Sequence, residues 1–233
     1  MNIQPIKAFS DNYIWVIEKE KRAIIVDPGE STEVLTYLTD KKLELAAILL
    51  THHHDDHTGG VSEILEKYPG TPVYGPEETP DLADHIVRAG DSFELLGQTF
   101  QVFKTAGHTE EHISFLTEDA LFCGDALFSG GCGRVFTKDY QAQYDALQTF
   151  NSLADDVKVY AGHEYTLTNL RFAHSVRPTN EILEEAINEA NDFREQGLPT
   201  LPSTIGREKE INLFLKAETL DEFRALRDAR DAF

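Results

Sequence analysis

Cysteine is scarce in this chain: only Cys123 and Cys132 occur among 233 residues. Two cysteines are too few for a disulfide scaffold at this length, so we expect reduced structural thiols and a cytoplasmic location. No long apolar run occurs, and no transmembrane helix is expected. The first residues, Met1 to Ile6, lack the basic region and apolar stretch of a signal peptide.

Basic residues are also few. There are 21 lysines and arginines against 41 aspartates and glutamates, which gives a net charge of −20. Nucleic acids and anionic membranes both attract basic surfaces, so neither is an expected partner. An anionic substrate would need a local basic patch inside this repelling field. The length fits one large domain, or one domain with a small appendage.

The densest polar cluster follows the apolar run from Leu45 to Leu50. Four histidines and two aspartates occupy residues 52–57. The short aliphatic run indicates a buried strand, and ligands of α/β sheets bind where strands end. Neutral imidazole and ionised carboxylate are ligands of divalent cations. A solvated loop is the simpler interpretation, but the interleaved aspartates and the preceding strand favour a metal site.

The same arrangement, an apolar strand followed by small residues and then His or Asp, recurs along the chain. Its members are His108, Asp125 and His163, after strands predicted at 99–103, 120–123 and 157–160. One histidine after a strand is usually structural, whereas four strand ends that meet at one sheet edge indicate a site. Asp27 ends another predicted strand, 22–26. It fits an ordinary turn residue and a carboxylate that supports a metal ligand from behind equally well.

Helical patterns replace strand patterns after residue 165. Helices are predicted at 34–43, 61–68 and 140–153 in the first part, and at 168–175, 181–196, 207–216 and 220–231 in the second. A run of strands followed by a run of helices suggests a separate helical module. We therefore expect a catalytic domain over residues 1–165 and a helical domain over residues 166–233.

The residue pattern His-x-His-x-Asp-His at 52–57, followed in order by His108, Asp125 and His163, resembles the metallo-β-lactamase-fold hydrolases. The resemblance implies an α/β fold, namely an αββα sandwich of two mixed sheets between helices, with a C-terminal α-helical domain. Within that group the whole chain is most similar to the glyoxalase II family of hydroxyacylglutathione hydrolases. The further matching segments are residues 130–134, 162–166, 212–215 and 227–233.

This resemblance implies two divalent metal ions per chain, with zinc preferred and iron or manganese as alternatives. The first metal site would consist of His52, His54 and His108, the second of Asp56, His57 and His163, and Asp125 would bridge the two. Asp56 and Asp125 would serve catalysis, with Asp56 orienting the attacking water. The implied contacts to glutathione are Arg134, Tyr165, Arg227 and Arg230. Phe136 stands where a tyrosine hydroxyl can contact glutathione in the family. His53 fits no ligand position, and His112 is expected to be structural.

The implied reaction is hydrolysis of S-D-lactoylglutathione and other S-2-hydroxyacylglutathiones by a hydroxide shared between two metals. It yields glutathione and a 2-hydroxy acid, as the second step of methylglyoxal detoxification. A thiolate with a pKa of about 8.5 leaves without a strong general acid. A monomer with this small-molecule substrate is expected. Three alternatives stay open: another hydrolase of this fold such as a lactonase or β-lactamase, a glutathione persulfide dioxygenase, and an electron-transfer module as in flavodiiron proteins.

Overall fold

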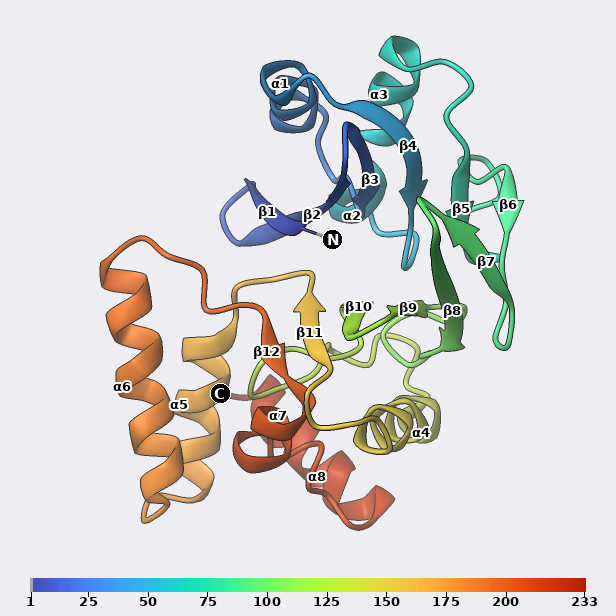
Figure 1. The fold of residues 1–233 in the computed structure, drawn as a ribbon. Helices are drawn as coiled ribbons and strands as arrows, with labels where there is room; N and C mark the ends of the chain where they lie inside the picture. Colours follow the sequence, from blue (N-terminus) through green and yellow to red (C-terminus); the bar gives the residue numbers. More distant parts are fainter. Residues whose placement is uncertain (1) are drawn as a thin grey trace.

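Two mixed sheets pack face to face, with helices on their outer sides (Figure 1). The computed structural model describes residues 2–233. The first sheet consists, in spatial order, of β1 (Asn2–Ala8), β2 (Asn12–Lys19), β3 (Arg22–Val26), β4 (Glu44–Leu49), β5 (Val73–Gly75) and β6 (His85–Ile86). The second consists of β12 (Ser203–Thr204), β11 (Lys158–Ala161), β10 (Ala120–Gly124), β9 (Ile113–Thr117), β8 (Gln98–Lys104) and β7 (Ser92–Leu95). The expected αββα sandwich is confirmed.

The helices cover both sheets on the outside. The first sheet carries α1 (Thr32–Lys41) and α3 (Val61–Lys67), and α2 (Asp55–Thr58) is a single turn that follows β4. On the side of the second sheet lie α4 (Tyr140–Asn151), α5 (Thr166–Val176), α6 (Glu181–Glu195), α7 (Ile205–Ile211) and α8 (Leu220–Asp231) (Figure 1). Val34 and Leu38 of α1 pack with Ile25 of β3 in one buried cluster, so the amphipathic face of the helix seals that sheet.

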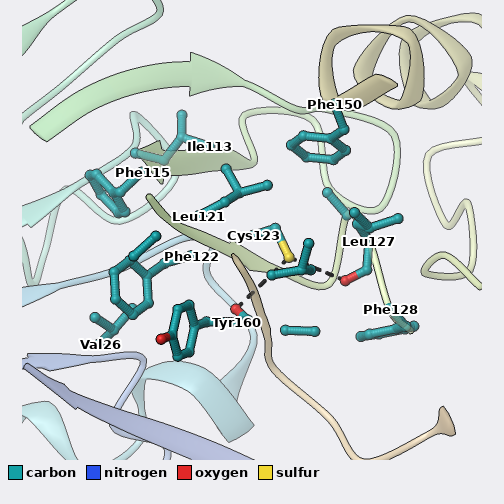
Figure 2. Close-up of a cluster of buried hydrophobic side chains, with 14 of the residues drawn as sticks. Val26, Ile113, Phe115, Leu121, Phe122, Cys123, Leu127, Phe128, Phe150 and Tyr160 are labelled. Atoms are coloured by element: carbon teal, nitrogen blue, oxygen red, sulfur yellow. Dashed lines mark hydrogen bonds between the residues drawn. The ribbon is translucent and has the colours of Figure 1, made fainter. Parts of the chain in front are cut away.

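The space between the sheets is filled by side chains that alternate along each strand. Figure 2 shows Phe122 of β10 beside Val26 of the first sheet, whereas Leu121 lies toward Phe150 of α4. Successive residues of a strand point to opposite faces, so β10 buries both of its sides. Each such side chain contributes about 1.5–3 kcal/mol when it leaves water. The buried strands form a firm base for the polar loops at their ends.

The C-terminal part differs from the sequence prediction in two places. Residues Ser203–Thr204 form β12, which pairs antiparallel with β11, although strand signals were expected to cease after residue 165. The helix predicted at 207–216 ends at Ile211, because Asn212 takes an extended conformation. Its side-chain oxygen accepts hydrogen bonds from the backbone N–H groups of Phe214 and Leu215. Such local side-chain bonds compete with helix formation.

Strand β1 was also missed by the sequence prediction, and it pairs antiparallel with β2 over its whole length. Its burial pattern alternates, as expected for a strand with one face toward water. Within residues 2–233, no helix has both the length and the apolar character needed to cross a bilayer.

Candidate metal centre and substrate pocket

Strands of both sheets end at one pocket with a volume of about 550 Å³. Strand β4 leads to residues 52–57, and β8, β10 and β11 lead to His108, Asp125 and His163. The two sheets are tied together at this point, since the backbone N–H of Tyr13 donates to the carbonyl of Gly162 at 2.8 Å. The four strand ends therefore meet at one place, as predicted, but they come from two sheets and not from one sheet edge.

The first group of three candidate metal ligands consists of histidines. His54 Nδ1 lies 3.1 Å from His52 Nε2 and 3.1 Å from His108 Nε2. The ligand atoms of all three lie within 4.8 Å of one another. Three imidazole nitrogens directed at one point suit a cation, because the lone pairs of neutral imidazoles can bind it together.

The second group combines one carboxylate with two imidazoles. His163 Nε2 lies 3.3 Å from Asp56 Oδ2 and 3.3 Å from His57 Nε2. This group also has its ligand atoms within 4.8 Å of one another. A mixed set of nitrogen and oxygen donors fits zinc, iron and manganese.

Asp125 lies between the two groups. Its Oδ2 is 3.4 Å from His108 Nε2 of the first group and 3.4 Å from His163 Nε2 of the second. Its Oδ1 lies 3.3 Å from His57 Nε2, yet this buried oxygen makes no hydrogen bond within the described residues. A buried acceptor without a hydrogen bond calls for an explanation, and a bridging cation supplies one. The donor set therefore fits a pair of divalent metal ions.

Proton affinities in the centre agree with this fit. Burial lowers the pKa of His57, but Asp125 and Asp27 together outweigh burial and raise the pKa to about 10. Burial also lowers the pKa of His163, but the neighbouring carboxylates, above all Asp125, raise it to about 11. By contrast, burial holds the pKa of His52 well below its usual value. Where an imidazole keeps a proton beside a carboxylate, a metal ion would displace that proton.

The far nitrogen of each buried ligand is held by a second partner. Asp27 Oδ2 lies 3.1 Å from His57 Nδ1, and this carboxylate also accepts hydrogen bonds from the N–H and hydroxyl of Thr51. His108 Nδ1 donates to the carbonyl of Arg134 at 2.9 Å. Such contacts fix the tautomer and direction of a metal-binding imidazole. For Asp27, the geometry favours the supporting role over an ordinary turn.

Three polar residues of the centre were not identified from the sequence. Asp11 Oδ1 lies 2.8 Å from His163 Nδ1, and Asn12 Nδ2 donates to Asp56 Oδ2 at 3.0 Å. Both precede or begin a strand, so a rule that looks at strand ends passes over them. His112 was assigned a structural role. Its Nε2 accepts the backbone N–H of Asp125 at 3.2 Å, which positions the central carboxylate.

Gly162 has a packing reason to lack a side chain. A Cβ at this position would lie 2.7 Å from Asp125 Oδ1 and 2.7 Å from His57 Cε1. Both distances are far inside van der Waals contact, so any side chain here would push the central carboxylate and a histidine apart. His53, by contrast, is half exposed and pairs with Glu78 at 3.3 Å, away from the ligand atoms.

A basic and aromatic rim surrounds the centre. Arg134, Tyr165, Arg227 and Arg230 all line the same pocket. The Tyr165 ring stacks on His163 with centroids 4.7 Å apart, and Phe136 borders His108 with centroids 5.3 Å apart. The predicted substrate contacts thus lie next to the metal ligands, as a patch of positive charge in an acidic protein.

Comparison with known proteins agrees with this geometry. Residues 9–163 match the metallo-beta-lactamase superfamily, and residues 164–233 match the hydroxyacylglutathione hydrolase C-terminus. A hydroxyacylglutathione hydrolase of Glaesserella parasuis is 55% identical over the full length of both chains. The chain belongs to the hydroxyacylglutathione hydrolase family. The resemblance inferred from the residue pattern is thereby confirmed.

A second relative and two solved structures also resemble this chain. A hydroxyacylglutathione hydrolase of Salmonella arizonae is 47% identical and covers 95% of this chain and 89% of its own. The crystal structure of ETHE1 from Myxococcus xanthus has a TM-score of 0.75 at 25% identity, over 98% of this chain and 90% of that one. The BLEG-1 B3 metallo-beta-lactamase has a TM-score of 0.70 at 25% identity, over 93% and 100%. These likenesses confirm the metallo-β-lactamase fold.

Proposed function

We propose that this protein hydrolyses 2-hydroxyacyl thioesters of glutathione, with S-D-lactoylglutathione as the principal substrate. The observation that carries the proposal is that five of the seven proposed metal ligands line one pocket together with three arginines, while His52 and His57 lie buried behind it. The arginines at the rim can bind the carboxylates of a glutathione moiety through charge-assisted hydrogen bonds, which are stronger than hydrogen bonds between neutral groups. The family relatives, which carry the name hydroxyacylglutathione hydrolase, support the same substrate class.

The proposed ligands form two sites with a shared carboxylate. His52, His54 and His108 would hold one ion, Asp56, His57 and His163 would hold the other, and Asp125 would bridge them. We propose zinc for both positions. Bound ions of this kind lower the pKa of water and polarise a carbonyl oxygen, which is the chemistry that thioester hydrolysis needs.

Asp56 is the proposed residue that orients the attacking water. Its side chain is 42% exposed and lines the pocket. A hydrogen bond with His163 is the main reason why its pKa lies below the usual range, so the carboxylate is anionic at neutral pH. Asn12 fixes one carboxylate oxygen by donating to Oδ2. An anionic, oriented carboxylate accepts a hydrogen bond from water and directs the remaining lone pair of the water.

The rim residues are proposed to place the substrate. Arg134 and Arg230 are the more accessible cations, and Tyr165 offers a phenol whose pKa burial raises, so its hydroxyl remains a donor at neutral pH. Phe136 adds an exposed apolar wall beside the metal ligands. After the acyl bond breaks, the thiolate leaves without a general acid because thiols are acidic enough.

We further propose that the chain acts as a cytoplasmic monomer with a division near residue 165. The part before it would supply the metal ligands and Arg134, and the helical part after it would supply Arg227 and Arg230.

A zinc-loaded protein tests the proposal directly. We expect loss of thioester absorbance with S-D-lactoylglutathione, and a loss of more than about a hundredfold in kcat/KM for His54→Ala through the lost metal site. His53→Ala is the matched control, since its half-exposed side chain points to Glu78 and not to the ligand group. Turnover of a β-lactam or a lactone in place of the thioester, or oxygen consumption with glutathione persulfide, would replace the proposal with one of the alternatives.

A further inference from the structure

A carboxylate of the protein already sits among the arginines of the pocket. Asp231, at the end of α8, lines the pocket together with Arg134, Arg227 and Arg230. Its Oδ1 lies 2.8 Å from Arg227 Nη2 and 3.3 Å from Arg134 Nε. One carboxylate oxygen therefore pairs with two of the three cations that are proposed to receive the carboxylates of the substrate.

Arg227 has a strong need for this counter-charge. Its residue is only 4% exposed, and its Nη1 donates to the carbonyl of Cys132 at 2.7 Å. Its Nε is buried and has no hydrogen-bond partner within the described residues. A buried guanidinium without an anion is costly, so an anion is required whether or not substrate is present. Asp231 is the one that the fold provides.

The other two arginines make weaker contacts with the protein than Arg227 does. The Arg134 side chain is 56% exposed and uses only Nε toward Asp231, which leaves its terminal nitrogens able to turn to another anion. Arg230 makes two long bonds of 3.4 Å to Asn169 and none to Asp231. Burial lowers the pKa of Arg230, Arg227 and Arg134 lower it further, and Asp231 opposes them. The three cations thus repel one another, and Asp231 offsets that repulsion.

We propose that Asp231 is an internal anion that competes with the glutathione carboxylates for the arginine cluster of the pocket. In the free protein it offsets one of the three positive charges of the cluster, and in the complex it limits the net positive charge available to the ligand. It thereby weakens the binding of glutathione and favours release of the product. This inference rests on the proposed function, because it needs a glutathione moiety at these arginines.

A role in merely orienting the arginines is the competing explanation. The pair of Asp231 with Arg134 is solvent-accessible on both sides, at 31% and 56% exposure. Exposed ion pairs hold their partners with little energy, typically under about 1 kcal/mol. Arg227 is in addition held by Cys132 from the opposite side. For Arg134, the charge of Asp231 is therefore expected to matter more to the ligand than its hold on the side chain.

The substitution Asp231→Asn removes the charge and keeps the shape. Asp228→Asn is the matched control, because Asp228 lies on the same helix, outside the pocket lining, and accepts a hydrogen bond from Tyr140 at 2.9 Å. Calorimetry on the zinc-loaded protein measures the Kd of glutathione, and product inhibition gives its Ki. Thermal unfolding without ligand measures stability. Glutathione diethyl ester, which lacks the free carboxylates, serves as the control ligand.

Asp231→Asn is expected to tighten glutathione binding by roughly three- to tenfold, since removal of one charge beside a half-exposed anion site has about this effect. The same variant is expected to unfold at a lower temperature, because Arg227 loses its counter-charge. Asp228→Asn and the diethyl ester should show no tightening. Opposite signs for ligand affinity and stability distinguish competition from an orienting or purely structural role.

Weaker or unchanged binding of glutathione by Asp231→Asn would overturn the inference and make Asp231 an orienting residue. If wild-type protein hydrolyses S-D-lactoylglutathione but this variant does not bind glutathione more tightly, only the inference fails. If wild-type protein neither hydrolyses the thioester nor binds glutathione, the proposed function fails and the inference falls with it.

Discussion

Glu208 of α7 offers a strict test of how the loop over residues 130–134, which carries Arg134, is held in place. It is fully buried, and its two oxygens accept four hydrogen bonds. The donors are the hydroxyls of Ser129 and Ser203, the backbone N–H of Gly130, and the side-chain amide of Asn212. Gly130 begins the loop that carries Cys132 and Arg134. The changes Glu208→Ala and Glu208→Gln both weaken this anchor, but to different degrees.

The magnitude follows from the donors that each change leaves unpaired. Glu208→Ala leaves the Gly130 N–H and the two serine hydroxyls without this acceptor, and each buried unpaired donor costs about 1–3 kcal/mol. The Asn212 amide keeps the carbonyls of Phe128 and Gly131 as acceptors. We expect a loss of about 3–5 kcal/mol in the free energy of unfolding. Glu208→Gln keeps one acceptor oxygen for the Gly130 N–H, and its amide can donate to the two serine hydroxyls, which turn to accept. Because only the charge assistance is lost, its cost should be about 1–2 kcal/mol.

The pH dependence of this effect has a definite sign. Burial raises the pKa of Glu208 above its usual value of 4.5, and the hydrogen bonds from Ser203 and Gly130 partly offset this. The folded protein thus holds this proton to a higher pH than the unfolded chain. Stability from this group is complete below pH 4.5 and is lost as the pH rises through the folded pKa. Glu208→Gln has no such proton, so it should gain stability relative to wild type over that interval.

Urea unfolding of the zinc-loaded variants at several pH values provides the measurement. Glu210→Ala on the same helix is the control, because Glu210 forms an exposed pair with Arg207 that is worth under about 1 kcal/mol. KM for the glutathione thioester should rise with Glu208→Ala because the loop with Arg134 loses its anchor. Equal costs for the two Glu208 variants, or a cost for Glu208→Ala as small as that of Glu210→Ala, would refute the reasoning.

Three further predictions concern the metal centre and the pocket wall. Asp27→Asn should weaken metal binding by roughly 10- to 100-fold through His57, measured by competition with a chromophoric chelator, and unchanged affinity would remove its supporting role. Metal binding should release protons and weaken as the pH falls, since His57 and His163 hold protons in the metal-free protein; a weakly buffered titration without proton release would disprove this. Phe136→Tyr should lower KM for the glutathione thioester about two- to tenfold by one added hydrogen bond, and an unchanged KM would mean that the hydroxyl misses the ligand.

The proposed metal ligands could be found from the sequence because each follows an apolar strand. Two examples are the run from Leu45 to Leu50 and the strand before His163. Both are short and largely buried, and the structure forms strands where the sequence predicts them. The parallel pairing of β10 with β11 then brings Asp125 and His163 to one edge. A physical rule about strand ends was enough for this part of the site.

The supporting residues could not be found in this way. Asp11 precedes a strand, and it meets His163 only because Tyr13 pairs with Gly162 across the two sheets. Glu208 reads as an ordinary charged residue of a helix, and its burial depends on partners as distant as Ser129. No local pattern reports such contacts, because they arise from tertiary packing.

The end of α7 and the role of Asp231 show the same limit. Asn212 belongs to an apparently helical pattern, but its amide donates to the carbonyls of Phe128 and Gly131 and its oxygen closes a local turn. The Asp231–Arg227 pair has the spacing of neighbours on one helix, whereas the pair with Arg134 joins residues that are 97 positions apart. Sequence spacing predicts the first kind of contact and not the second.

The most direct test of the central claim compares two thioesters. Zinc-loaded protein is assayed with S-D-lactoylglutathione and with a lactoyl thioester of a small thiol that lacks the glutathione carboxylates. We predict a large preference in kcat/KM for the glutathione ester, and its collapse in Arg230→Ala. Equal rates for the two esters would indicate a generic metal-dependent thioesterase, and would contradict recognition of glutathione by the arginines of the pocket.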